Sequence, residues 1–193
     1  MKLFHAPGSC SEGILFLLKI IGEPFEIVTI DLKTRAQFSP EYRAVNPKGK
    51  VPALQRPDGS LLTEFPAIAW WLAKTHPALK LIGTDVEAEV RTLEALDYLV
   101  ASVHMRGFTL VKATPKFVSS PEAIDQLRTF GMSEVTMHLG RISDMLGDKP
   151  YLLGEFSIAD AAAFYLLRWA TADGLAVSDS LLAYFERLNA KLA

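Results

Sequence analysis

One proline constrains the fold of this chain more than any other residue. Pro52 stands where a short apolar strand should begin, inside the segment 46–54, which reads NPKGKVPAL. Proline has no backbone N–H to donate to a sheet, so an ordinary central strand is disfavoured there. A tight X-Pro turn, sometimes with a cis bond, suits the position. Such a turn would leave the backbone N–H and C=O of Val51 free to pair with an extended peptide.

A carboxylate follows close behind this turn. Glu64 comes at the end of the apolar run 61–63 and opens the next helical pattern. A ligand amine could meet that carboxylate while the ligand backbone pairs with Val51. A free backbone edge with a carboxylate beside it indicates a binding site for a small peptide.

Composition excludes several classes of protein. The net charge of −2 and the pI near 6.1 give no basic surface for nucleic acid. A single cysteine rules out an internal disulfide, which favours a reducing compartment. The apolar run 14–21 is interrupted by Lys19, is too short to cross a bilayer, and has no cleavage site after it. We therefore expect a soluble, cytoplasmic protein that binds neither membrane nor nucleic acid.

The first half of the chain mixes strands and helices. Ser9 is the expected N-cap of a first helix, with Glu12 completing a capping box. Gly22 is expected to end that helix. The predicted elements are strands at 2–6 and 25–32, a short helix from Ser39, a hairpin at 52–56 and 60–62, and helices at 10–21 and 65–75. This order is that of the thioredoxin-like fold.

The second half carries only helical periodicity. Helices are predicted at 86–112, 121–147, 157–173 and 179–191. Ser157 and Asp160 form a second capping box. The fold class is therefore α/β plus all-α, a thioredoxin-like domain followed by a helical domain. The expected division is 1–76 for the first domain, 77–85 for a linker and 86–193 for the second domain.

Four motifs in this order resemble the glutathione S-transferases. They are PGSC at 7–10, NPKGKVPAL at 46–54, LLTE at 61–64 and FSIAD at 156–160. The resemblance covers nearly the whole chain and is greatest to the bacterial beta class, which has a cysteine at the position of Cys10. It implies an enzyme that conjugates reduced glutathione, its co-substrate, to small hydrophobic electrophiles, and that acts as a homodimer.

The resemblance assigns glutathione contacts in the first domain. Glutathione would lie as an extended strand beside Val51 and Pro52, with Glu64 on its γ-glutamyl amine. Phe65 replaces the family's usual serine or glycine, so only its backbone N–H can serve. Arg35 matches a lysine that binds the glycyl carboxylate. Neighbouring cations that could substitute for Arg35 are Lys33, Lys48 and Lys50.

The helical domain would complete the site. Asp97 matches a residue that points toward the glutathione of the other subunit, and His104 matches a histidine at the sulfur. Their spacing of seven residues would place both on one helix face. With an ordinary pKa near 6.5, His104 could change charge in the working range. The chain has one residue more than the beta class after this histidine, so Arg106 would replace a family lysine only after a helical bulge.

Cys10 has two readings from its position alone. The start of a helix favours a thiolate, but a helix end supplies about 0.3–1 kcal/mol, less than the about 1.4 kcal/mol that one pKa unit represents. An inert, buried thiol is equally consistent with the position. The resemblance favours a cysteine in the glutathione site, and we name Cys10 and His104 as the catalytic residues.

The electrophile would need an apolar pocket. His5 stands where the beta class usually has tyrosine, close to Cys10, and could support the thiolate or simply pack. Phe108 and Phe117 follow the site helix and are the aromatic candidates for this pocket. The four histidines are widely scattered, so no metal site is predicted.

Two other functions remain open. Cys10 could form a mixed disulfide with glutathione and act as a monothiol oxidoreductase. A non-catalytic interaction module is a third possibility, because transferase-like folds also serve that purpose. The replacement by Phe65 and the inserted residue favour this third reading, whereas the joint presence of Cys10, Glu64 and His104 favours an enzyme.

Overall fold

Four short strands form one mixed sheet in the first half of the protein. The computed structural model describes residues 1–192 and places the strands in the order β2-β1-β3-β4. They are β1 (Lys2–His5), β2 (Glu26–Thr29), β3 (Ala53–Gln55) and β4 (Leu61–Thr63). β1 runs parallel to β2 and antiparallel to β3, and β4 closes a hairpin with β3. The predicted βαβ–ββα order is confirmed, with shorter strands than expected.

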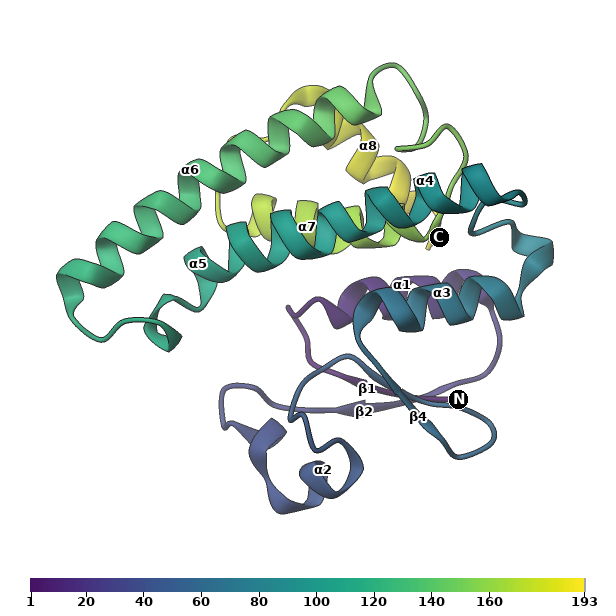
Figure 1. Cartoon of the computed structure of the whole chain (residues 1–193), viewed down its shortest axis with the longest axis horizontal. Coiled ribbons are helices and arrows are strands. Elements are labelled where there is room, and N and C mark those ends of the chain that lie inside the picture. The colour runs from purple at the N-terminus through teal and green to yellow at the C-terminus, as the bar shows by residue number, and fades with distance from the viewer. Residues whose placement is uncertain (193) are drawn as a thin grey trace.

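Helices cover both faces of this sheet. α1 (Ser11–Ile21) and α3 (Phe65–Thr75) lie between the sheet and the helical domain, while α2 (Pro40–Val45) lies on the opposite face (Figure 1). α1 is apolar on most of its circumference, which suits a helix buried on both sides. Ser39 caps α2, since its hydroxyl accepts the Tyr42 N–H at 3.2 Å.

The predicted cap of α1 is displaced. The helix begins at Ser11, and Glu12 accepts a hydrogen bond from the Gly8 N–H at 3.0 Å instead of from Ser9. The Ser9 hydroxyl accepts the Ser11 N–H at 3.2 Å. Cys10 therefore occupies the N-cap position itself, one residue before the first turn in which it was expected.

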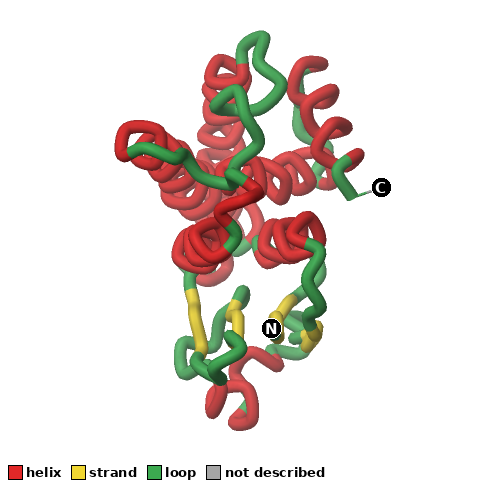
Figure 2. Tube along the Cα trace, turned by 90° about the vertical axis from the view of Figure 1, so that its right-hand side faces the viewer, coloured by secondary structure: helices red, strands yellow, loops and turns green. Residues whose placement is uncertain are grey.

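The helical half confirms the four predicted helical stretches. The helices are α4 (Val86–Asp97), η3 (Tyr98–Phe108), α5 (Thr109–Lys112), α6 (Pro121–Leu146), α7 (Ile158–Ala172) and α8 (Asp179–Ala190), with a single 3-10 turn at η4 (Thr114–Lys116). Two further 3-10 turns, η1 (Ala36–Phe38) and η2 (Pro77–Leu79), come before the helical half. In residues 1–192 the only pairing outside the sheet is a single bridge between Leu153 and Glu155. Figure 2 shows the strands in the lower half of the molecule, with a short helix below them and the other helices above.

η3 is a π-helix in the middle of the predicted helix 86–112. The segment Tyr98–Phe108 winds more widely than the α-helices before and after it. A π turn accommodates one extra residue in a helix. The helical bulge expected from the residue inserted after His104 is therefore present.

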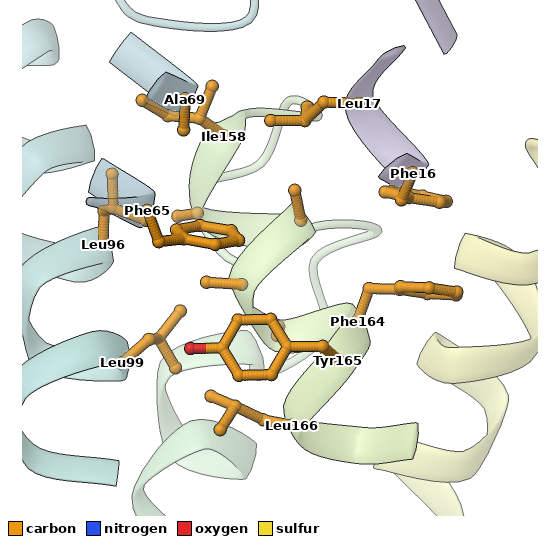
Figure 3. Packing of buried hydrophobic residues seen from close by; sticks show 14 of the residues in the cluster. Phe16, Leu17, Phe65, Ala69, Leu96, Leu99, Ile158, Phe164, Tyr165 and Leu166 are labelled. Atoms are coloured by element: carbon orange, nitrogen blue, oxygen red, sulfur yellow. The ribbon is translucent and has the colours of Figure 1, made fainter. Parts of the chain in front are cut away.

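One core joins the two halves. α1 packs so closely on α7 that a Cβ on Gly13 would lie 2.4 Å from the Ala161 carbonyl oxygen. Phe16 of α1 stacks on Phe164 of α7 with ring centroids 4.3 Å apart. Figure 3 shows side chains from both halves in this core, among them Phe16, Phe164 and Leu99. The relative position of the halves is therefore fixed by packing.

The second capping box is confirmed at the start of α7. The Asp160 carboxylate accepts the Ser157 N–H at 2.8 Å and the Leu152 N–H at 3.0 Å, and it also accepts the Tyr184 hydroxyl. Burial raises the pKa of Asp160, although these donors oppose the effect. The box fixes the start of the helix that the first half packs against.

Candidate functional site

A cavity of about 250 Å³ lies between the two halves of the protein. Its walls come from the start of α1, the loop before β3, the start of α3 and the helix η3. The lining residues are Cys10, Asn46, Lys48, Lys50, Val51, Pro52, Thr63, Glu64, Phe65, Pro66, Val100, His104 and Met105. Eight of the residues predicted from the sequence to bind a ligand thus meet in one place: Cys10, Val51, Pro52, Glu64, Phe65 and His104, together with the alternative cations Lys48 and Lys50.

The loop before β3 is held by its own hydrogen bonds. The Tyr42 hydroxyl and the Asn46 amide both donate to the Lys50 carbonyl, at 2.7 and 2.8 Å. Gly49 has a φ of 59°, and a Cβ there would lie 2.9 Å from the Gln37 carbonyl oxygen. Glycine is required at this position because a side chain would be both strained and obstructed. The loop is therefore fixed before any ligand arrives.

Val51 presents its backbone to the cavity. The Val51–Pro52 peptide bond is cis, as the tight-turn interpretation allowed. Among residues 1–192, no acceptor takes the Val51 N–H. Within the same part of the chain, the Val51 carbonyl accepts only the thiol of Cys10, with sulfur and oxygen 3.8 Å apart. An extended peptide could take up both groups.

Cys10 is an un-ionised thiol. Burial raises the pKa of Cys10 to about 12, the Glu64 carboxylate adds to the rise, and local backbone N–H groups oppose it only partly. The activation expected from the start of α1 is thus outweighed, because desolvation of the anion exceeds what a helix end supplies. At neutral pH this thiol is a hydrogen-bond donor at the cavity wall.

Glu64 stands in a strained backbone conformation. Its φ is 70°, a value that few residues with a side chain adopt. Lys48 donates to the Glu64 carboxylate at 2.7 Å and to the Thr63 hydroxyl at 2.8 Å. Strained residues persist where the surroundings hold them, often at ligand sites. The ion pair with Lys48 holds this carboxylate at the cavity, ahead of α3.

His104 enters the cavity from the π-helix η3. Its Nδ1 lies 3.2 Å from the hydroxyl of Tyr165, and the Trp169 ring stands edge-on at a centroid distance of 4.9 Å. Burial lowers the pKa of His104 to about 4. The expected charge change near pH 6.5 is therefore wrong, and the imidazole is neutral at physiological pH.

Three predicted contacts lie outside the cavity. Arg35 is exposed, and its guanidinium lies over the Phe38 ring at 5.3 Å. Arg106 is directed to Glu134 of α6, with Nε 3.5 Å from the carboxylate. Asp97 is exposed at the end of α4 and does not line the cavity, and the helix changes from α- to π-geometry between it and His104.

The predicted aromatic pocket is not assembled. Phe108 is fully buried in the core and Phe117 is 54% exposed, so neither lines the cavity. His5 is buried beside α1, where its Nδ1 lies 2.7 Å from the Ser11 hydroxyl. Burial lowers the pKa of His5. In this structure His5 packs and hydrogen-bonds at the start of α1 and does not line the cavity.

Sequence reasoning missed several lining residues. Val100 and Met105 form an apolar wall beside His104, and Asn46 and Thr63 hold neighbours in place. Asn46 was visible as the first residue of the proline motif. The sequence shows Met105 as the extra residue after His104. Its place in the cavity wall could not be predicted, because the π-winding of η3 decides which way the residue faces.

In the part of the chain from 1 to 192, no three His, Cys, Asp or Glu side chains are placed to hold a metal ion. None of the helices described there is long and apolar enough to cross a membrane.

Comparison with known proteins agrees with this geometry. The sequence matches two family profiles, described as glutathione S-transferase N-terminal domain over residues 8–75 and C-terminal domain over residues 121–188. It is 35% identical to glutathione S-transferase GstA of Escherichia coli O157:H7, over 97% of this chain and 92% of that protein.

Solved structures agree over the whole chain. The beta-class glutathione S-transferase of Sphingomonas chungbukensis is 33% identical with a TM-score of 0.82, over 100% of this chain and 97% of that one. A sphingomonad glutathione S-transferase solved in complex with glutathione is 31% identical with a TM-score of 0.83, again over 100% and 97%. The sequence profiles, the relatives and the fold therefore agree that this chain belongs to the glutathione S-transferase family.

Proposed function

We propose that this protein transfers the thiolate of reduced glutathione to small hydrophobic electrophiles. The observation that carries the proposal is the cavity in which the backbone of Val51, the carboxylate of Glu64 and the side chains of Cys10 and His104 converge. Each matches one part of the tripeptide: its backbone, its amine and its sulfur. Holding thiolate and electrophile together accelerates their reaction by proximity.

The two ends of glutathione would be held by charge. Glu64 and the N–H of Phe65 would bind the γ-glutamyl end. Lys50 is a better candidate than Arg35 for the glycyl carboxylate, because Lys50 lines the cavity. Among residues 1–192 the Lys50 ammonium has no carboxylate partner, whereas Lys48 is paired with Glu64.

The sulfur would lie between Cys10 and His104. Both groups are neutral at physiological pH, since burial raises one pKa to about 12 and lowers the other to about 4. Neutral N–H and S–H donors can stabilise a thiolate without trapping it in an ion pair. The apolar wall of Val100 and Met105 would receive the electrophile.

A conjugation assay with 1-chloro-2,4-dinitrobenzene tests the chemistry. His104→Ala and Cys10→Ala should each lower turnover or glutathione affinity, whereas Cys10→Ser retains a donor and should stay near wild type. Wild-type values in both alanine variants would reject the assignment of these residues.

The un-ionised thiol argues against the oxidoreductase reading. A mixed disulfide with glutathione needs a thiolate on Cys10, which its raised pKa disfavours. Mass spectrometry after incubation with glutathione disulfide distinguishes the two chemistries. Rapid formation of a glutathione adduct on Cys10 would favour the oxidoreductase.

We also propose a cytoplasmic homodimer. An apolar groove on α3, β4 and α4 would pack against a second copy, and its residues are Leu62, Pro66, Ala67, Trp70, Trp71 and Leu93. Asp97, exposed at the end of α4, would then face the glutathione of the partner. The cytoplasm is proposed because the reaction needs reduced glutathione.

A further inference from the structure

A buried tyrosine of α7, Tyr165, packs against two residues that line the cavity, Phe65 and His104. Tyr165 of α7 is fully buried. Its ring stands edge-on to Phe65 at a centroid distance of 5.3 Å and edge-on to His104 at 5.6 Å. Figure 3 shows the ring near Phe65 with its hydroxyl pointing toward the helix that carries Leu99, which is also the helix of His104.

The hydroxyl has one partner. Within residues 1–192 its only hydrogen bond is the one to Nδ1 of His104, at 3.2 Å. Two proton arrangements fit this distance: either the phenol donates to a bare Nδ1, or a protonated Nδ1 donates to the phenol oxygen. The second arrangement would leave the phenol hydrogen without an acceptor in an apolar core. A buried donor without an acceptor carries the full desolvation penalty, so the first arrangement is favoured.

The ionisation states agree with a donating phenol. Burial raises the pKa of Tyr165 well above its ordinary value, so the hydroxyl keeps its hydrogen. Burial alone accounts for the lowered pKa of His104, and no charged group contributes to it. Because a neutral imidazole carries one hydrogen, a bare Nδ1 requires that hydrogen on Nε2.

We propose that Tyr165 is a positioning residue that holds neutral His104 in its Nε2–H tautomer, so that the imidazole offers an N–H to the sulfur in the cavity. This inference rests on the proposed function for the identity of the acceptor, but the tautomer itself is a property of the ligand-free protein. A carboxylate in place of the phenol would raise the pKa of His104 and favour the imidazolium. The uncharged phenol orients the ring and leaves it neutral.

The tautomer is measured without any ligand. Nitrogen-15 NMR of histidine side chains distinguishes Nε2–H from Nδ1–H imidazole, and wild-type His104 should show the Nε2–H pattern at neutral pH. Tyr165→Phe keeps the ring and removes the hydroxyl, so its His104 should show a mixture of tautomers. An Nδ1–H pattern in wild type, or an unchanged spectrum in Tyr165→Phe, would overturn the proposal.

Tyr184→Phe is the matched control. Tyr184 is also a fully buried tyrosine, but its hydroxyl donates to Asp160, in the capping box of α7. This variant should lose stability and leave the His104 spectrum unchanged. A tautomer mixture in Tyr184→Phe as well would overturn a specific role for Tyr165.

Kinetics then test the effect on the sulfur. In Tyr165→Phe the pKa of bound glutathione thiol, read from thiolate absorbance, should rise by about half a unit to one unit, and kcat for 1-chloro-2,4-dinitrobenzene should fall about three- to tenfold, the size of one weakened hydrogen bond. The dissociation constant of glutathione should change less than twofold, because the ends of the peptide are held elsewhere. An unchanged thiol pKa with weaker binding would show that Tyr165 only packs.

A double variant distinguishes a positioning role of Tyr165 from a packing role. His104→Gln presents an amide N–H that has no tautomer to fix, so adding Tyr165→Phe should cause no further loss of kcat. A further loss of the same size would overturn the proposal. If wild-type protein binds no glutathione, the proposed function fails, whereas the NMR result still decides the tautomer.

Discussion

At Glu64 the backbone adopts a φ of 70°, a conformation that a residue with a Cβ reaches only at a cost of about 1–2 kcal/mol. We therefore expect Glu64→Gly to be more stable than Glu64→Ala by about 1–2 kcal/mol, because only glycine is relieved of the strain. Both variants lose the carboxylate and should bind glutathione weakly. Chemical denaturation of the two variants measures the difference directly.

Ala and Gly variants at an unstrained site give the comparison for this measurement. Glu41, in the first turn of α2, is exposed and has a negative φ. Glu41→Gly should be less stable than Glu41→Ala, the reverse of the order at Glu64. The same order at both positions would mean that Glu64 is not strained.

Cys10 should resist alkylation at neutral pH. With a pKa of about 12, its thiolate fraction at pH 8 is ~10⁻⁴, against roughly a quarter for a free thiol. Iodoacetamide reacts with thiolates, so native protein should be modified thousands of times more slowly than protein unfolded in urea. The rate should rise tenfold per pH unit up to the limit of stability. As Cys10 is the single cysteine, thiol loss reports on it alone. Equal rates in native and unfolded protein would contradict an un-ionised Cys10.

Among the elements, η3 is a π-helix, and its wider turns accommodate one residue more than an α-helix of the same length. Met105 is 50% exposed there, and it is the residue that separates this chain from the beta-class pattern. Its deletion should convert the π turn to regular α-helix while the buried positions on either side keep their places. We expect a melting temperature within a few degrees of wild type, measured by thermal denaturation.

A deletion in a regular helix is the control. Met137 of α6 is likewise exposed, at 40%. Removing it would turn the rest of α6 by about 100° and take Leu139 and Ile142 out of the core. That variant should lose several kcal/mol of stability or fail to fold. Equal tolerance of both deletions would mean that η3 holds no surplus residue.

Most elements could be predicted because their signals are local. Ser39, Ser157 and the glycine at 22 mark helix ends by their own chemistry, and these ends are confirmed. The start of α1 could not be predicted to the residue, because the Ser9 hydroxyl bonds the Ser11 hydroxyl and N–H instead of an N–H deeper in the first turn. The inserted residue after His104 predicted a helical bulge, but no local signal predicted a π-helix over the whole of Tyr98–Phe108.

At the scale of the whole molecule, the sequence indicated which residues would meet but not how far each is desolvated. Cys10, Glu64 and His104 do line one cavity, whereas Phe108 and Phe117 do not. The pKa values of Cys10 and His104 depend on burial between the two halves, which no local pattern encodes. For the same reason the partner of His104, Tyr165, looked like any core aromatic residue.

The proposed dimer gives a prediction at this scale. Ala67→Arg places a charge in the apolar groove of α3 without disfavouring the helix, so the protein should sediment as a monomer. Ala44→Arg, on exposed α2 across the sheet, should leave a dimer. A wild-type monomer at micromolar concentration, or a dimer that survives Ala67→Arg, would contradict packing through this groove.

Calorimetric titration with reduced glutathione tests the central claim most directly. We expect saturable binding by the wild-type protein, at least about tenfold weaker in Glu64→Ala, because the ligand amine loses its carboxylate partner. Glu41→Ala, an exposed change on α2, should bind like wild type. No binding at millimolar glutathione, or an affinity that Glu64→Ala leaves unchanged, would contradict a glutathione site in this cavity.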